Sequence, residues 1–359
     1  MSSEFGRILR VSVFGQSHGQ AIGIVMDNVP AGEAIDEAEL LAFMDRRKPQ
    51  GDLSTKRREQ DIPIFLSGLA EGRTCGSPLC AILENRDVRS EDYEALRNIP
   101  RPSHADYVAY RKWDGQADMR GGGHFSGRLT AALCAGGGIA KQILARRGIF
   151  VGAHLLAVAG REDTPFGLHP TRELFCSIAQ KPFPVVDDAS GIDMQQAIRE
   201  AAEDKDSVGG IVECAAIGLP VGLGSPLFEG IENRLAAALF GIPAAKGVEF
   251  GNGFESARQR GSEHNDPIVL DDQMSITMEK NDAGGINGGI TNGMPLRLCV
   301  AFKPTPSIGK PQRSVNLANG EETELIIEGR HDPCIAHRAV PVVEAVTALV
   351  LLDLLLEES

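Results

Sequence analysis

Histidines beside glycine-rich turns are the residues of this 359-residue sequence best suited to chemistry. Residues 15–19 read Gly-Gln-Ser-His-Gly and follow a strand-like stretch, so we expect Ser17 and His18 at the tip of an exposed turn. The spacing differs from the Gly-x-Ser-x-Gly pattern of hydrolase nucleophiles. A histidine in such a turn suits general acid or base catalysis, because its pKa lies near neutrality; a purely structural histidine is the alternative.

A second histidine, His104, follows a proline in residues 101–106, which read Arg-Pro-Ser-His-Ala-Asp. Arg101 would lower the pKa of this histidine, whereas Asp106 would raise it. The sequence alone does not decide whether the pKa of His104 is raised or lowered.

Glycine-rich stretches supply a different chemistry, which is anion binding by the backbone. Residues 120–126, Arg-Gly-Gly-Gly-His-Phe-Ser, run into the expected start of a helix. Successive backbone N–H groups and the positive end of a helix would cradle a phosphate there, although three glycines also serve plain turns. Residues 281–289, 303–307 and 329–334 are three further stretches rich in glycine, proline or charged residues.

Helices and strands that alternate without a regular βαβ rhythm must position these residues. Apolar patterning predicts strands at 8–14, 21–27, 149–158, 210–217 and 295–301 and helices at 126–147, 193–204, 231–240 and 342–356. Asp36 and Glu39 form a capping-box pattern that begins another helix, which Pro49 ends. Gly136, Gly137 and Gly138 lower helix propensity inside the long helix, so we expect close packing there. No linker or repeat divides the chain, and we predict one domain over residues 1–359.

Charge favours a small anionic ligand over a nucleic acid or a membrane. The chain carries 36 basic and 49 acidic residues, a net charge of −13. Residues 1–150 are nearly balanced, with 20 basic and 19 acidic residues, and contain clusters at 46–48 and 56–58. Such clusters are either solvated surface or an arginine pocket that matches phosphate and carboxylate oxygens.

The remaining composition predicts a soluble cytoplasmic protein. The seven cysteines include no Cys-x-x-Cys pair, which disfavours a metal site and a disulfide framework. Residues 339–356 are strongly apolar, but Pro341, Glu344 and Asp353 interrupt them, as in a buried helix. No dinucleotide fingerprint or Walker A motif is present, which weakens nicotinamide or ATP as the organising ligand.

The motifs together resemble those of the chorismate synthase family, lyases that make chorismate from 5-enolpyruvylshikimate 3-phosphate. The matching stretches, in the family's order, are residues 15–19, 46–49, 57–59, 101–106, 120–123, 281–289, 303–307 and 329–334. The resemblance implies an α+β fold of helices between antiparallel sheets (a β-α-β sandwich), a homotetramer, and reduced FMN that is not consumed. It also implies an anti-1,4-elimination of phosphate with loss of a ring hydrogen.

The same resemblance implies residue roles. His104 would protonate the leaving phosphate, His18 would protonate or hold the reduced flavin, and Asp332 with Ser17 would help flavin N5 accept the substrate proton. The implied FMN contacts are His124, Phe125, Ser126, Pro243, Ala244, Gly288, Lys303, Pro304, Thr305, Pro306, Ser307 and Arg330. The substrate carries one phosphate and two carboxylates, for which we predict a pocket of Arg46, Arg47, Arg120, Arg128 and Arg338.

The sequence departs from the family pattern at three places. Gln16 stands where glutamate is usual, His124-Phe125 replaces a common Arg-Ser, and the loop at 50–55 is one residue shorter and lacks an arginine. We therefore expect NADPH only as an indirect reductant. Two other classes stay open: a flavin oxidoreductase with net redox, and a phosphosugar-binding module, which would leave His18 and His104 idle.

Overall fold

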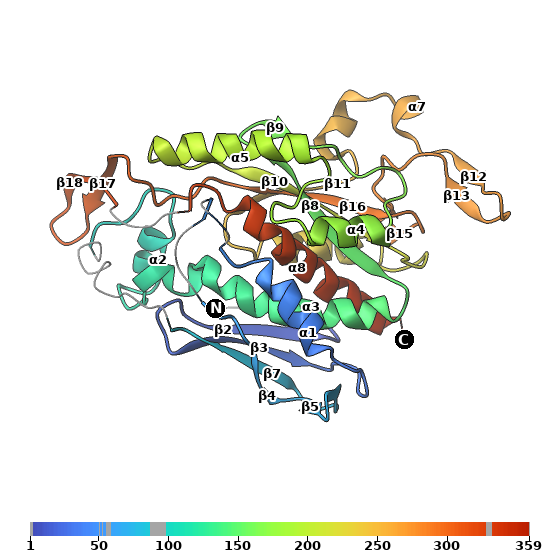
Figure 1. Ribbon diagram of the computed structural model, residues 1–359, viewed down its shortest axis with the longest axis horizontal. Coiled ribbons are helices and arrows are strands. Elements are labelled where there is room, and N and C mark those ends of the chain that lie inside the picture. Colours follow the sequence, from blue (N-terminus) through green and yellow to red (C-terminus); the bar gives the residue numbers. More distant parts are fainter. Residues whose placement is uncertain are drawn as a thin grey trace.

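Two antiparallel sheets enclose a layer of helices in this protein, for which the computed structural model describes residues 3–49, 51, 53–54, 59–86, 98–327 and 332–358. The first sheet has the order β1 (Glu4–Phe5), β2 (Arg10–Gly15), β3 (Ala21–Asp27), β7 (Leu79–Glu84) and β4 (Ile64–Ser67). The second has the order β11 (Ala245–Phe250), β16 (Leu296–Phe302), β10 (Gly210–Ile217), β8 (Phe150–Val158) and β9 (Arg161–Glu162). Figure 1 shows α1, α3 and α8 between them, which confirms the predicted sandwich.

Shorter hairpins and further helices complete the described chain. The hairpins are β5 (Leu69–Ala70) with β6 (Arg73–Thr74), β12 (Ile268–Leu270) with β13 (Ile276–Met278), β14 (Ile286–Asn287) with β15 (Ile290–Thr291), and β17 (Gln312–Asn316) with β18 (Glu321–Leu325). The α-helices are α1 (Glu37–Asp45), α2 (Asp106–Lys112), α3 (Thr130–Ala145), α4 (Arg172–Ala179), α5 (Asp188–Glu203), α6 (Ile231–Leu239), α7 (Gly261–His264) and α8 (Ala336–Glu357). The 3₁₀ turns are η2 (Arg120–Phe125), η3 (Gly127–Leu129), η4 (Leu227–Glu229) and η5 (Gly253–Arg258).

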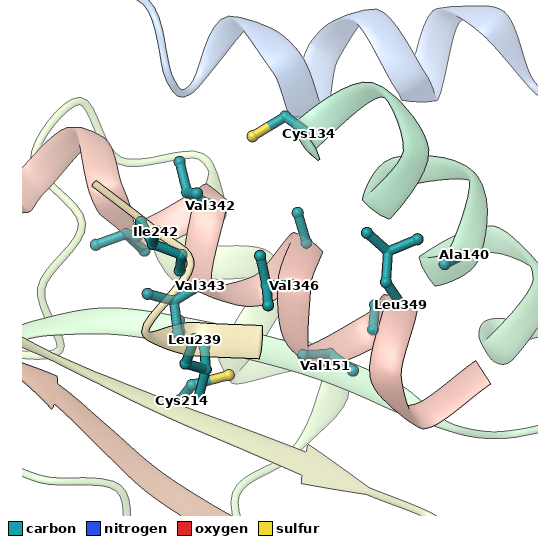
Figure 2. Close-up of a cluster of buried hydrophobic side chains, with 14 of the residues drawn as sticks. Cys134, Ala140, Val151, Cys214, Leu239, Ile242, Val342, Val343, Val346 and Leu349 are labelled. Carbon is teal, nitrogen blue, oxygen red and sulfur yellow. The ribbon is translucent and has the colours of Figure 1, made fainter. Parts of the chain in front are cut away.

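The glycines of α3 let this helix pack closely on three neighbours, as the sequence predicts. A methyl group at Gly137 would overlap Ala345 of α8, one at Gly136 would overlap Ile24 of β3, and one at Gly138 would overlap Leu40 of α1. Figure 2 shows side chains of α8 between α3 and the second sheet; the labelled residues are Cys134, Ala140, Val151, Cys214, Leu239, Ile242, Val342, Val343, Val346 and Leu349. The interior of the sandwich is therefore centred on α8.

Helix α8 is long and apolar enough to cross a membrane by length and composition, with a mean hydropathy of 2.2. Its apolar window is, however, 89% buried inside the fold, as in the core helix of a globular protein. Its buried Asp353 accepts hydrogen bonds from the backbone N–H groups of Arg7 (2.9 Å), Ile8 (2.9 Å) and Leu9 (2.8 Å). The polar interruptions of the apolar run thus have partners within the fold.

Local capping explains where the predicted helix boundaries hold and where they shift. The side chain of Asp36 accepts a hydrogen bond from the backbone N–H of Glu39 at 3.0 Å, so Asp36 caps the helix as predicted. The reciprocal half of the capping box does not form, because the backbone N–H of Asp36 donates to Gln142 at 2.9 Å. The long helix was expected from Ser126, but this side chain caps the 3₁₀ turn η3, so α3 begins only at Thr130. Helix α5 begins at Asp188 rather than Asp193, because Asp187 caps it.

A fully buried histidine lies inside the second sheet. His154 of β8 contacts carboxylates through both ring nitrogens: Nδ1 is 3.0 Å from Oδ2 of Asp163, and Nε2 is 2.8 Å from Oε2 of Glu213. Arg297 of β16 also binds Glu213, at 2.7 Å. Burial alone would lower the pKa of His154, but hydrogen bonds to the two carboxylates raise it.

We predict that Gly137→Ala lowers the free energy of unfolding by about 1–3 kcal/mol, because its new methyl group must displace the α8 backbone at Ala345. Gly261→Ala is the matched control: it also adds a methyl group to a helical glycine, but open space surrounds it, so we expect a change within about 0.5 kcal/mol. Urea unfolding of both variants measures the difference. Equal stability of the two would contradict the close packing.

Candidate functional site

A cavity of about 830 Å³ lies beside the first turns of α3 and α8. Figure 1 shows these first turns at the left ends of the two helices. The volume of the cavity lies in the upper part of the range of ligand pockets, roughly 300–1,000 Å³. Most of the residues predicted from the sequence line it: Arg47, His104, His124, Phe125, Ser126, Arg128, Pro243, Ala244, Lys303, Thr305, Pro306, Ser307, Asp332 and Arg338. The fold thus gathers side chains that are up to 291 positions apart in the chain.

Two buried guanidinium groups on one wall share a single carboxylate. Arg47 binds Oδ2 of Asp61 at 2.7 Å, Arg128 pairs with Oδ1 of the same side chain, and each of the three residues is no more than 6% exposed. Burial would raise the pKa of Asp61, but the two arginines hold it below its usual value, so the carboxylate stays ionised. These three side chains together carry one net positive charge and line the cavity, as does Glu59, which also interacts electrostatically with Arg128.

A third arginine extends this cluster. Arg338, in the first turn of α8, binds Oδ2 of Asp332 at 2.7 Å and donates from Nε to the backbone carbonyl of Arg47 at 3.0 Å. Thr305 donates from its hydroxyl to the carbonyl of Asp332 at 2.6 Å. These bonds tie the start of α8 to the arginine wall and to the loop after β16.

His104 is oriented by its own segment. Its Nδ1 is 2.7 Å from Oδ1 of Asp106, and Arg101 binds the same carboxylate through Nε (2.7 Å) and Nη2 (2.8 Å). Burial would raise the pKa of Asp106, but bonds to Arg101 and His104 hold it well below its usual range. The ionised Asp106 therefore fixes the proton on Nδ1 and leaves Nε2 to face the glycine run, next to Gly122.

The triple glycine brings the two predicted histidines close to one backbone segment. Gly121, Gly122 and Gly123 have φ values of 59°, 92° and 55°, which only glycine adopts without strain. A methyl group at Gly121 would overlap the ring of His18 and approach the Ser17 hydroxyl, whereas one at Gly122 would contact His104. His18 and Ser17 do not themselves line the cavity; they lie behind Gly121, which does.

His124 is held through both ring nitrogens. Its Nδ1 donates to the backbone carbonyl of Gly15 at 2.8 Å, and its Nε2 lies 2.7 Å from the Ser3 hydroxyl. These bonds fix the side chain at the position where the family pattern commonly has an arginine.

Two lysines, Lys246 and Lys303, add positive charge to the cavity. Lys303, at the end of β16, donates to the backbone carbonyl of Ser103, and burial together with the nearby Lys246 lowers its pKa. Lys246 lies at a bulge in β11, where the register shifts between Ala245 and Gly247. Both lysines line the cavity.

Five predicted residues do not join these walls. Arg46 is turned away into an ion pair with Glu344 at 2.6 Å, because the helix exit sends adjacent side chains in different directions. Arg120 is exposed and binds Asp118 at 2.7 Å, and Gly288 is exposed in the β14–β15 hairpin. Pro304 lies against Gly209 rather than in the cavity, and Arg330 lies outside the described residues.

Three residues of the site were not among the predicted site residues. Asp61 and Lys246 stand in stretches without a motif, and only the tertiary fold brings them to the cavity. Asp106 belongs to the histidine motif, and its spacing of two residues from His104 was the one available signal. In the part of the chain that the structure describes, no cluster of histidine, cysteine and carboxylate side chains fits a metal ion.

Comparison with known proteins agrees with this arrangement. A model of the family described as chorismate synthase matches residues 9–356. The chain is 49% identical to the chorismate synthase of Thermococcus gammatolerans, over 99% of this chain and 98% of that protein. The chain belongs to the chorismate synthase family.

Other chorismate synthases give the same result. That of Korarchaeum cryptofilum is 46% identical over 97% of this chain and 96% of its own length. A crystal structure of a chorismate synthase superposes with a TM-score of 0.77 at 28% identity, over 99% of this chain and 93% of that one. Membership makes the protein an enzyme of aromatic biosynthesis, in the shikimate pathway.

We predict that Asp61→Asn lowers the free energy of unfolding by about 3–5 kcal/mol, because it leaves two buried guanidinium groups without their counter-charge. Added phosphate should restore part of that loss, since an anion in the cavity replaces the carboxylate. Asp118→Asn, which removes an exposed pair with Arg120, is the control and should cost about 1 kcal/mol or less. Urea unfolding with and without phosphate tests this, and similar losses in both variants would contradict it.

Proposed function

We propose that this protein converts 5-enolpyruvylshikimate 3-phosphate to chorismate and inorganic phosphate by anti-1,4-elimination, with reduced FMN and no net redox change. The observation that carries the proposal is that the arginine cluster around Asp61 lines the same cavity as His104, which Asp106 orients. Membership of the chorismate synthase family supports the same reaction. The enzyme is then a carbon–oxygen lyase.

The arginines account for binding of the substrate. Its phosphate and two carboxylates need several charge-assisted hydrogen bonds, and the guanidinium groups of Arg47, Arg128 and Arg338 line one side of the cavity. Asp61 and Asp332 hold these groups in place before the substrate arrives. A fixed array of this kind loses little side-chain entropy when the anion binds.

His104 accounts for departure of the phosphate. The C–O bond breaks with its electron pair on the phosphate oxygen, and a proton at Nε2 of His104 neutralises the charge that develops there. Asp106 stabilises the imidazolium that donates this proton, as it accepts a hydrogen bond from Nδ1. The ring hydrogen leaves from the other end of the four-carbon system, and a new C=C bond forms.

The lining fits a flavin. Phe125 offers an aromatic face that is 37% exposed, Val342 and Val346 make an apolar wall, and Thr305 and Ser307 supply polar groups at its edge. The Ser17 hydroxyl is buried behind Gly121 and has no hydrogen-bond partner among the described residues, so it is available to a ligand. When bound there, reduced FMN would lend electron density to the substrate and recover it as the product forms.

His18, Ser17 and Asp332 would manage the remaining proton. Gly121 has no side chain, so the ring of His18 and the hydroxyl of Ser17 come within reach of a molecule in the cavity. Asp332 lines the same cavity and is oriented by Arg338. We assign to His18 the proton of the reduced cofactor and to Asp332 with Ser17 the proton lost by the substrate.

We also infer a cytoplasmic homotetramer. All seven cysteines are free thiols, as expected in a reducing compartment. The edge strand β4 exposes Ile64 and Leu66, with Ile62 just before it, and another copy of the chain would cover such an apolar edge.

We predict that His104→Ala and His18→Ala each lower turnover by about 10²–10⁴, the usual effect of losing a general acid or base. Asp106→Asn should also lower turnover, because it removes the carboxylate that accepts the hydrogen bond from Nδ1 and orients the His104 ring. Tyr107→Phe, an exposed neighbour, is the control and should be neutral. Near-normal rates in folded histidine variants would refute the assignment.

We predict that the purified protein forms chorismate only when FMN is supplied already reduced and oxygen is excluded, with no net flavin oxidation. Oxidised FMN with NADPH in the dark should give no product, because NADPH serves only through an outside reductase. Anaerobic assays that follow chorismate and phosphate distinguish the two conditions. Sustained turnover with NADPH and no added reductase would overturn the prediction, and NADPH use in proportion to product would favour an oxidoreductase.

A further inference from the structure

We propose that a second cavity, between α1, α3, α4 and the start of β8, binds a small monocarboxylate that carries a flat apolar ring. This cavity has a volume of about 310 Å³, near the lower end of the range of ligand pockets, which suits a single ring. It shares no lining residue with the first cavity in the described part of the chain. The proposal does not depend on the reaction assigned above.

The floor of the second cavity holds more positive than negative charge. Glu344 of α8 is 2% exposed and is shared by Arg46, at 2.6 Å, and by Lys141. Burial would raise the pKa of Glu344, but these two cations lower it to about 2, so the carboxylate is ionised at neutral pH. One buried carboxylate therefore faces two cations, and one further anion would balance them.

The rim leaves this excess unchanged. Arg172 of α4 and Glu39 of α1 both line the opening and are both exposed, so their charges offset each other. The charged groups that face the cavity thus carry a net charge of +1, which matches a monocarboxylate better than a phosphate ester or a dicarboxylate.

Aromatic rings form the walls. Phe43, Phe150 and Phe175 line the cavity, and Gly138 and Gly152 contribute no side chain there. Lys141 lies 4.7 Å from the centroid of the Phe43 ring, so a charge and an aromatic face stand side by side. A flat ring packed on these faces would direct its carboxylate toward Lys141 and Arg46.

Two adjacent arginines line different cavities. Arg46 and Arg47 follow directly on α1, yet Arg47 lines the first cavity and Arg46 lines the second. The family resemblance suggested both as substrate ligands. The geometry instead assigns Arg46 to a separate anion site.

An exposed thiol in the lining of the second cavity provides a direct test. Cys176 of α4 lines the second cavity and is exposed, while Cys75 is exposed elsewhere and serves as an internal control. Benzoate at saturation should slow the reaction of Cys176 with N-ethylmaleimide at least about fivefold and leave Cys75 unchanged, as followed by peptide mass spectrometry of the full-length protein. Benzylamine, which has the same ring and the opposite charge, should not protect Cys176.

Substitutions at exposed positions test the role of charge in the second cavity without disturbing the fold. Arg172→Gln should raise the benzoate concentration needed for half-maximal protection about 5- to 10-fold. The substitution removes one cation at the rim and leaves Arg46, Lys141 and Glu344 in place. Arg313→Gln, which removes an exposed arginine on β17, should leave the protection unchanged. Absence of protection by benzoate, equal protection by benzylamine, or unaltered protection in Arg172→Gln would each overturn the proposal.

Discussion

The contact between Gly137 of α3 and Ala345 of α8 sets the spacing of the helical layer, and the rest of the structure depends on it. Because no side chain intervenes, the two helices approach closely enough for both sheets to close over them. The first turns of the same helices carry Thr130 and Arg338 at the edge of the large cavity. The close approach of these two helices therefore determines both the packing of the interior and the position of the arginine wall.

The protein is acidic overall, yet it presents positive charge to an anion, because buried carboxylates hold a few arginines in fixed positions. Asp61 neutralises only one of the two arginines that it binds, and Asp332 orients a third. The same principle recurs at Glu344, which two cations share. At Asp61 and at Glu344, one buried carboxylate fixes the geometry of two cations and balances the charge of only one of them.

Local signals in the sequence predicted most of the helices and strands. Features that depend on long-range contacts could not be predicted from such signals. The cap at Asp36 and the glycines of α3 follow from neighbours in the chain, so both could be predicted. The side chain of Arg46 is directed by Glu344, which is 298 positions away, whereas that of Arg47 is directed by Asp61 and Thr130, and no local pattern distinguishes these adjacent arginines. Asp61 was missed for the same reason, since its partner Arg128 lies 67 positions further on.

The buried His154 changes how the charge of this protein should be counted. Both of its ring nitrogens lie within hydrogen-bond distance of carboxylate oxygens, and hydrogen bonds to these carboxylates raise its pKa. The net charge of −13 counts every histidine as neutral, so it leaves out the positive charge that this side chain contributes in the fold. Unfolding removes both carboxylates and lowers the pKa of His154, so protons pass to the buffer near neutral pH, and the measured heat of denaturation includes the ionisation enthalpy of the chosen buffer.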